Sequence, residues 1–156
     1  MILVSACLLG VNCKYSGKNN ENLEVIQLIK KKGGIPVCPE QLGGLTTPRL
    51  PAEIKGGEGM DVLCDSAKVI QKDGVEVTEA FVKGAKETLK IAEDFEVNQA
   101  ILKARSPSCG MGQIYDGSFS GVSIKGDGVT AALLKSKNIT VYTEENIAKI
   151  LQSIDI

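Results

Sequence analysis

The sequence contains no histidine and no tryptophan, and its 156 residues include only three phenylalanines and three tyrosines. Without histidine, the chain lacks the commonest acid–base group of enzymes and the Ser-His-Asp and Cys-His arrangements that activate a nucleophile. Every histidine-ligated metal site is excluded for the same reason. Metal binding or covalent catalysis must therefore rely on cysteine, carboxylate or hydroxyl side chains.

Long runs of one residue type are also absent. The 18 Lys and Arg are balanced by 19 Asp and Glu, and no basic run exceeds Lys30–Lys32, so a dedicated nucleic-acid binder is disfavoured. No apolar run approaches the roughly 20 residues that span a bilayer, and Met1–Val4 carries no charged leader. We therefore predict a cytoplasmic protein with no membrane segment, folded as a single domain over residues 1–156.

Five cysteines occur at irregular spacing, at positions 7, 13, 38, 64 and 109. Because the number is odd, a complete set of intramolecular disulfides is excluded, and a reducing compartment is favoured. A lone cysteine is most often a small buried hydrophobe, and Cys64 in Val62–Asp65 is predicted to lie apart from the others, in the core or on a loop. The remaining thiols are candidates for metal ligation or catalysis.

Apolar segments of strand length alternate with amphipathic segments of helix length. The expected strands are 2–6, 35–38, 97–103 and 139–142. The expected helices are 21–32, one capped by Thr78 that continues through Ala92, one from Asp127 or Thr130 to Lys135, and a last one capped by Thr143. This alternation predicts an α/β fold with a mainly parallel sheet and helices on its faces.

Two further segments have their own signals. Residues 68–77 alternate in polarity around Asp73-Gly74, which predicts a β-hairpin. Residues 39–60 are rich in proline and glycine and follow no helix or strand period, so we predict a long ordered loop there. Loops of that length in a compact domain usually carry function.

Three cysteines follow the predicted strands. Cys7 comes after the first strand, Cys38 ends the second, and Ser106–Cys109 follows the third. Because the carboxyl ends of parallel strands meet at one edge of a sheet, these thiols are expected to converge there. They are therefore the best candidates for one shared site.

Three or four thiolates without histidine can hold either zinc or an iron–sulfur cluster. Structural zinc usually uses Cys-x2-4-Cys pairs, whereas Cys7 and Cys13, the most closely spaced pair here, have five residues between them. A cluster assembled from distant loops fits this spacing better. A thiolate nucleophile at Cys109, activated by Lys103, Arg105 or a helix N-terminus, is a third alternative.

Seven longer segments have distinctive sequences. They are Ser5–Gly10, Lys14–Gly17, Val37–Gly44, Thr47–Glu53, Lys103–Gly110, Tyr115–Gly117 and Gly126–Ala131. In this order they resemble the thiouracil desulfurase family, and the resemblance covers essentially the whole chain. It implies a single-domain, Rossmann-like fold and a 4Fe-4S cluster that is held by only three cysteines.

The resemblance implies that Cys7, Cys38 and Cys109 are the cluster ligands, and that Glu40 and Ser106 are catalytic. An iron without a protein ligand would act as a Lewis acid on a thiocarbonyl sulfur, so that water attacks the carbon and hydrosulfide leaves without net redox change. Glu40 would be the general base, and Ser106 would hydrogen-bond the same water. Considered alone, Glu40 is more typical of a solvated loop carboxylate and Ser106 of a Ser-Pro turn.

Arg49, Arg105 and Ser108 lie in the loops that flank this predicted site and are predicted to bind substrate. Each guanidinium could meet a pyrimidine carbonyl or a phosphate, or could anchor its loop to backbone carbonyls. Cys13 occupies a position that is often not cysteine in the family. It could be a fourth ligand or a sulfur acceptor, but we favour a bystander thiol beside the cluster.

Together these features predict non-redox desulfuration of thiolated pyrimidines of the thiouracil or thiouridine type. A free thiobase or thionucleoside is favoured over thiolated RNA, because the chain has no room for the added domain of longer family members. One alternative is a closed four-cysteine iron–sulfur or zinc protein with an electron-transfer or structural role. Another is a cysteine-persulfide sulfur carrier. The sequence leaves the oligomeric state open.

Overall fold

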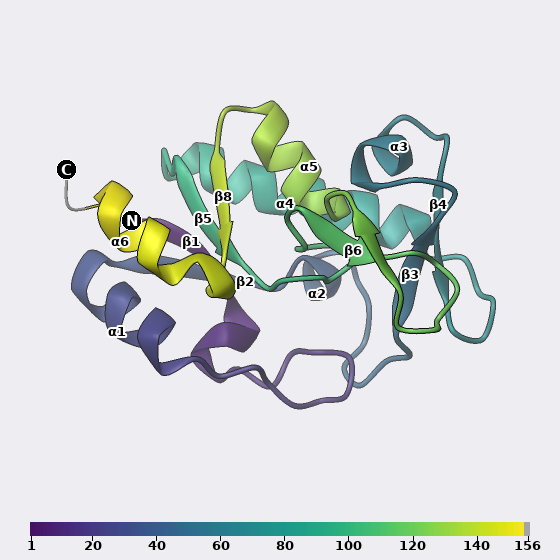
Figure 1. The fold of residues 1–156 in the computed structure, drawn as a ribbon, viewed down its shortest axis with the longest axis horizontal. Coiled ribbons are helices and arrows are strands. Elements are labelled where there is room, and N and C mark those ends of the chain that lie inside the picture. The colour runs from purple at the N-terminus through teal and green to yellow at the C-terminus, as the bar shows by residue number, and fades with distance from the viewer. Residues whose placement is uncertain (155–156) are drawn as a thin grey trace.

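A computed structural model describes the backbone of residues 1–154 and the side chains of residues 1–152. Its central sheet has four parallel strands in the order β2-β1-β5-β8 (Figure 1). These strands are β1 (Ile2–Ser5), β2 (Gly34–Val37), β5 (Gln99–Leu102) and β8 (Thr140–Thr143). In register, Leu3 of β1 lies beside Ile35 of β2 and Ala100 of β5.

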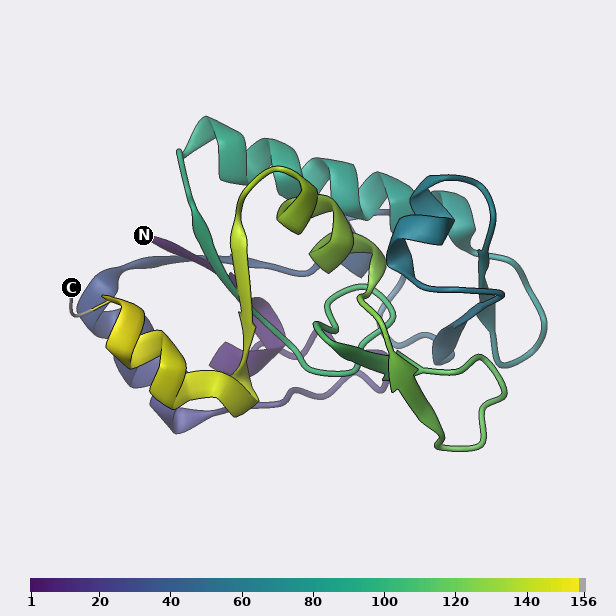
Figure 2. The ribbon, with the colours of Figure 1, turned by 45° about the horizontal axis from the view of Figure 1, so that its top comes forward.

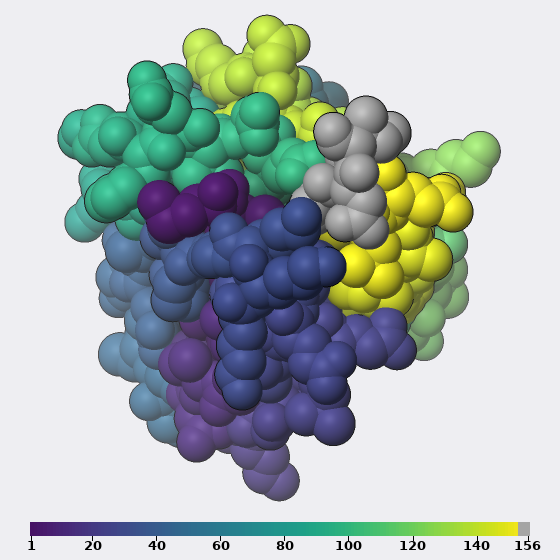
Figure 3. Space-filling view, turned by 90° about the vertical axis from the view of Figure 1, so that its left-hand side faces the viewer, coloured from purple at the N-terminus to yellow at the C-terminus, as the bar shows by residue number. Residues whose placement is uncertain are grey.

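Helices cover both faces of this sheet, as the alternating pattern predicted. The helices α1 (Leu23–Lys32) and α6 (Ile147–Ile154) lie beside each other on one face, which Figure 3 shows from their side. The helices α4 (Thr78–Asp94) and α5 (Val129–Ser136) pack together on the other face (Figure 2). The α/β class with a parallel sheet is therefore confirmed.

Alternation along the strands produces one core on each face. Ile2 and Val4 of β1 pack into a cluster with Val25 of α1 and Ile150 of α6. Leu3, between them in sequence, packs into the opposite cluster with residues of α4 and α5. Because successive strand side chains point to opposite faces, a strand that is apolar throughout is buried on both. This explains why the uninterrupted apolar run at the N-terminus became the central strand.

The region predicted to be a long ordered loop, residues 39–60, contains more regular secondary structure than expected. It contains α2 (Pro39–Leu42), β3 (Ala52–Lys55) and the start of α3 (Gly59–Leu63). The elements are only four or five residues long, which is too short for a helix or strand period to be visible in the sequence. The prediction of one long loop was therefore wrong.

The predicted hairpin at 68–77 is also only partly formed. Its first strand, β4 (Lys68–Gln71), pairs antiparallel with β3, and the turn at Asp73-Gly74 is closed by a single Ile70–Glu76 bridge. A third core cluster beneath β3 and β4, which includes Ile54, Val69 and Phe81, explains this choice. Pairing with β3 buries apolar side chains that a local hairpin would have left exposed.

Two other local predictions need correction. Thr78 is the first residue of α4 and does not cap it, because its hydroxyl accepts a hydrogen bond from the Val69 amide at 3.0 Å instead. The short hairpin of β6 (Gln113–Tyr115) and β7 (Ser123–Lys125) was not predicted. Within the described part of the chain, none of the helices combines the length and the apolarity needed to cross a bilayer.

Candidate functional site

The carboxyl ends of β1, β2 and β5 surround a cavity of about 300 Å³. The chain passes from β1 to β2 on one side of β1, while β5 lies on its other side, so the cavity sits where the order of connection reverses. Such a switch point is the usual ligand site of open parallel sheets. The volume is at the lower end of the range for small-molecule sites.

All three cysteines that follow predicted strands line this cavity. Cys7 follows β1, Cys38 follows β2, and Cys109 lies beyond β5. Cys13 lines the same cavity and is only 2% exposed. Cys64 lies apart, as predicted, but it is exposed at the end of α3 and not buried as a small hydrophobe would be.

Local backbone contacts hold each of these thiols in place. Cys7 lies in the 3-10 turn η1 (Ala6–Leu9), and its carbonyl accepts from the amides of Gly10 at 3.2 Å and Asn20 at 2.9 Å. Gly10, with φ at +89°, permits the sharp reversal after η1. The Cys109 amide donates to the Ser106 hydroxyl at 3.0 Å. These positions are fixed by the backbone before any ligand binds.

Cys13 sits between Cys7 and Cys38 and changes the acidity of both. Its thiol donates to the Cys38 sulfur, which lowers the pKa of Cys38 to about 6, and the Gln41 amide and the Arg49 charge act in the same direction. The same thiol and the Asn20 side chain lower the pKa of Cys7 to about 7. Hydrogen bonding with these two neighbouring sulfurs, Cys38 first and then Cys7, raises the pKa of Cys13 itself. The pKa values of Cys7 and Cys38 are therefore lowered toward neutral pH, with Cys13 as the neutral partner.

Cys109 has a different environment, since complete burial raises the pKa of its thiol to about 12. A positively charged metal group would stabilise the thiolate form of this buried sulfur, which burial disfavours. Among residues 1–154, no three Cys, Asp or Glu side chains gather closely enough around one point to hold a single metal ion. Soft donors delivered from three separate loops suit a cluster, in which each thiolate binds a different iron.

Glu40 lies in the first turn of α2 and forms a nearly buried ion pair. Its Oε2 accepts from Arg49 Nε at 2.6 Å, and the two side chains are 17% and 5% exposed. Glu40 does not itself line the cavity, whereas Arg49 does. The Glu40 charge nevertheless acts on the neighbouring thiols. It partly opposes the lowering of the Cys38 pKa and adds to the raising of the Cys109 pKa.

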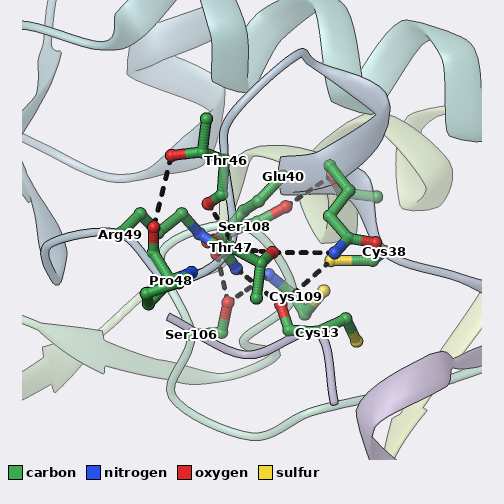
Figure 4. Close-up of polar contacts among 12 residues, drawn as sticks. Cys13, Cys38, Glu40, Thr46, Thr47, Pro48, Arg49, Ser106, Ser108 and Cys109 are labelled. Atoms are coloured by element: carbon green, nitrogen blue, oxygen red, sulfur yellow. Dashed lines mark hydrogen bonds and ion pairs between the residues drawn. The ribbon is translucent and has the colours of Figure 1, made fainter. Parts of the chain in front are cut away.

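Besides pairing with Glu40, Arg49 anchors its own loop (Figure 4). The guanidinium donates to the Thr46 carbonyl at 3.2 Å, the Thr47 hydroxyl at 3.0 Å and the Cys13 carbonyl at 3.0 Å. With the Glu40 bond, these contacts occupy four of its five N–H donors. Of the two roles open at the level of sequence, the structure therefore shows the anchoring one.

Arg105 and Ser106 also line the cavity. Arg105 has a positive φ of +65° and forms an ion pair with Glu145, which raises the pKa of the guanidinium. The Ser106 hydroxyl accepts from the amides of Ser108 at 3.1 Å and Cys109 at 3.0 Å. Since these bonds use both of its lone pairs, the hydroxyl can only donate to a ligand.

Ser108 was predicted to bind substrate, and the geometry corrects this. Its side chain is 1% exposed, does not line the cavity, and lies 2.9 Å from the Thr130 hydroxyl of α5. The Ser-Pro-Ser-Cys turn points alternate hydroxyls in different directions, which a linear sequence does not reveal. Ser108 therefore ties the turn to α5, and we leave it out of the proposed site.

Several residues at this site were not singled out from the sequence. Glu144, just after β8, accepts hydrogen bonds from the Ala104 amide at 3.0 Å and from Lys103 Nζ at 3.0 Å. Its position after a parallel strand was the signal that could have found it. Lys14, Tyr15, Asn20 and Tyr115 also line the cavity.

Comparison with known proteins agrees with this geometry. The chain matches the model of the 2-thiouracil desulfurase family over residues 2–146. It is 48% identical over 151 residues to the uncharacterized protein YbbK of Bacillus subtilis (strain 168), which covers 97% of this chain and 100% of the relative. It also resembles the solved structure of the 4Fe-4S-dependent thiouracil desulfidase TudS, with a TM-score of 0.87, 36% identity, and coverage of 99% of this chain and 97% of the other.

Proposed function

This chain belongs to the 2-thiouracil desulfurase family, and we propose that it converts thiolated pyrimidines to their oxo forms with release of hydrosulfide. The observation that carries this proposal is the meeting of Cys7, Cys38 and Cys109 in one cavity from three different strand ends. In this proposal, residues 1–156 act as a single desulfurase domain.

A 4Fe-4S cluster is the cofactor that this donor set fits best. The similar solved protein is 4Fe-4S-dependent, which supports the same cofactor here. Cys7, Cys38 and Cys109 would hold it, and the pKa values of Cys7 and Cys38 are already lowered, to about 7 and about 6, which eases their deprotonation on binding iron. When bound, such a cluster supplies Lewis acidity toward the thiocarbonyl sulfur at an iron that has no protein ligand.

Glu40 and Ser106 activate and orient the attacking water in this mechanism. Glu40 does not line the cavity but is held through Oε2 by Arg49, which does, and we assign its other carboxylate oxygen to accept a proton from the attacking water. The Ser106 hydroxyl, with both lone pairs occupied by amides, donates a hydrogen bond to the water oxygen and orients it. The water oxygen bonds to the pyrimidine carbon, the C–S bond breaks, and sulfur leaves as hydrosulfide. No electrons are exchanged.

The substrate proposed is a free thiobase or a thionucleoside. The cavity of about 300 Å³ has to hold both the cluster and the substrate, so it favours a ligand no larger than one small ring system. The formal net charge of -1 offers no broad attraction to a nucleic-acid backbone, so thiolated RNA is not favoured. Five free thiols support a reducing, cytoplasmic setting.

One observation favours a second candidate, a closed four-cysteine site. The Cys13 thiol contacts both Cys7 and Cys38 and could itself become a ligand. A cluster or zinc ion ligated by four thiolates would serve electron transfer or structure, not the binding of substrate sulfur. A metal-free persulfide carrier is the remaining rival.

Anaerobic purification followed by metal analysis and a 2-thiouracil assay separates these candidates. The proposal predicts about four irons per chain, together with equal amounts of uracil and hydrosulfide from 2-thiouracil. One zinc ion and no turnover would establish the structural rival. Four irons without turnover would favour the closed cluster, and turnover by a metal-free protein would establish the persulfide carrier.

A further inference from the structure

The loop of residues 10–20 forms one side of the cavity mouth, and the mechanism above assigns it no part in recognising substrate. Lys14 and Tyr15 line the cavity from this loop. The loop is closed on itself and on the sheet edge, because Asn20 donates to the Cys7 carbonyl at 2.9 Å and Gly17 donates to the Lys14 carbonyl at 2.9 Å. Its side chains therefore project from a fixed backbone.

Tyr15 combines a fixed backbone with an exposed ring. Its carbonyl accepts from the Arg49 amide at 2.8 Å, yet the residue is 46% exposed. An aromatic ring held at the wall of a cavity offers a flat, amphipathic surface at little entropic cost. Stacking on such a ring suits any planar base and is worth ~1–3 kcal/mol per base when the ring is removed.

Lys14 differs from the other cations that line the cavity. Each of those already has a carboxylate partner, in the pairs Arg49–Glu40, Lys103–Glu144 and Arg105–Glu145. Within residues 1–154, the contacts shown for Lys14 Nζ are with neutral groups, the Asn20 amide oxygen at 3.5 Å and the Tyr15 ring at 5.6 Å from its centroid. Lys14 is thus the cavity cation whose charge is available to an incoming acceptor.

We infer that Lys14 and Tyr15 recognise the base, with Tyr15 stacked against the pyrimidine ring and Lys14 donating a hydrogen bond to its exocyclic oxygen. The inference rests on the proposed function and deepens it by naming the residues that recognise the base. The ligands that this pair selects carry both a thiocarbonyl sulfur and a ring oxo group on a planar ring. Thiocarbonyl compounds without a planar ring or an oxo group are poor ligands.

The iron–sulfur bond and the Lys14 hydrogen bond recognise different atoms of the substrate. Sulfur ligation reads only the sulfur atom, so it does not separate a thiobase from any other small thione. A site built to hydrogen-bond a substrate oxygen discriminates strongly against the analogue that lacks it, because a polar group is then left without its partner. Charged donors such as Lys14 make the stronger hydrogen bonds of this kind.

The stacking half is tested by calorimetry of uracil binding to the cluster-loaded protein, since uracil has no sulfur. Tyr15→Leu is expected to weaken uracil binding about tenfold, whereas Tyr15→Phe keeps the ring and the affinity. The control is Phe95→Leu, which removes another exposed ring, 58% against 46% exposed for Tyr15, that lies beyond the end of α4 and away from the cavity. Hydrosulfide binding is expected to be the same in all four proteins. Unchanged uracil affinity in Tyr15→Leu would overturn stacking.

The hydrogen-bonding half is tested by comparing uracil with pyrimidin-2-one, which lacks the second oxo group. Wild-type protein is expected to prefer uracil about tenfold, and Lys14→Met is expected to bind the two compounds equally. Lys18→Met, in the same loop but outside the cavity lining, is the charge-matched control. A preference for uracil that persists in Lys14→Met would overturn the role of Lys14.

These tests separate the inference from the proposed function. If wild-type protein with its cluster releases no hydrosulfide from 2-thiouracil, the proposed function fails, whatever the uracil affinities are. If it releases hydrosulfide while Tyr15→Leu and Lys14→Met bind uracil as wild type does, the function stands and the inference fails.

Discussion

The floor and the rim of the cavity are built differently. The floor consists of Cys7, Cys13, Cys38 and Cys109, and the rim of Lys14, Tyr15 and Arg105. Floor residues such as Cys13 and Cys109 are 2% and 6% exposed, whereas Tyr15 on the rim is 46% exposed. Buried sulfurs on a fixed backbone suit a resident cofactor that must stay in place and be shielded from solvent. Exposed side chains suit a ligand that must enter and leave.

Two arginines show the same contrast. Arg49, beside the floor, is 5% exposed and donates to Glu40, two threonines and Cys13. Arg105, on the rim, is 35% exposed and pairs with Glu145. A buried guanidinium with four of its five donors engaged organises the site, while an exposed ion pair contributes little stability. Substitutions in the floor are therefore expected to have larger effects than those in the rim.

The largest effect is expected from Cys38→Ala. Loss of one of three ligands should reduce the iron content from about four per chain to near zero and remove the brown absorbance. Cys64→Ala is the matched control, because Cys64 is exposed and does not line the cavity. Metal analysis after anaerobic reconstitution measures both variants. Four irons in Cys38→Ala would remove this cysteine from the ligand set.

Glu40→Gln should retain its iron and lose turnover by ~10²–10⁴-fold, because the amide keeps the shape of the side chain but does not accept the water proton. Hydrosulfide release and iron content are measured together. Glu24→Gln, an exposed carboxylate of α1, is the control. Full activity in Glu40→Gln would exclude Glu40 as the base, and loss of the cluster would give the carboxylate a structural role.

Ser106→Ala should reduce turnover less than Glu40→Gln, roughly tenfold, since the hydroxyl orients the water without taking its proton. It also leaves two amides without their acceptor, so the free energy of unfolding should fall by about 1 kcal/mol. Ser108→Ala provides the contrast, because loss of the Thr130 contact should lower stability and leave turnover unchanged. Equal losses of turnover in the two variants would return Ser108 to the site.

Cys13→Ser should leave iron content and desulfuration largely intact, because three other thiolates suffice and the hydroxyl still donates to its neighbours. Burial of a more polar group at a position that is 2% exposed should lower the free energy of unfolding by about 1 kcal/mol. Iron analysis and urea denaturation measure the two effects. Loss of the cluster in this single variant would favour the closed, four-cysteine site.

The smallest effect is expected at the rim, from Glu145→Gln. Glu145 is 52% exposed and its partner Arg105 is 35% exposed, so stability should change by no more than about 0.5 kcal/mol. Glu144→Gln is the sharper comparison, since Glu144 is 12% exposed and holds the Ala104 amide and Lys103. Glu144→Gln should lower the free energy of unfolding by about 1–3 kcal/mol. Equal effects in denaturation would contradict the contrast between buried and exposed pairs.

The main sheet and the meeting of the cysteines were predictable from the sequence. Buried parallel strands appear as short apolar runs, and the run at 2–6 became the central β1. The strand β3 and the β6–β7 hairpin were not predictable, because these short strands mix polar with apolar residues and so lack the apolar runs of the main sheet. Their pairing depends on partners elsewhere in the chain.

The sequence by itself determined which thiols reach the edge of the sheet, because each of three cysteines follows a strand and parallel strands end on the same side. Only the tertiary structure decided which way the polar side chains of the same loops point. Glu40 turns to Arg49, and Ser108 turns to Thr130 in α5, 22 residues further along the chain. A side chain in a turn adopts the direction in which it finds a partner, and such partners are brought together only by the packed fold.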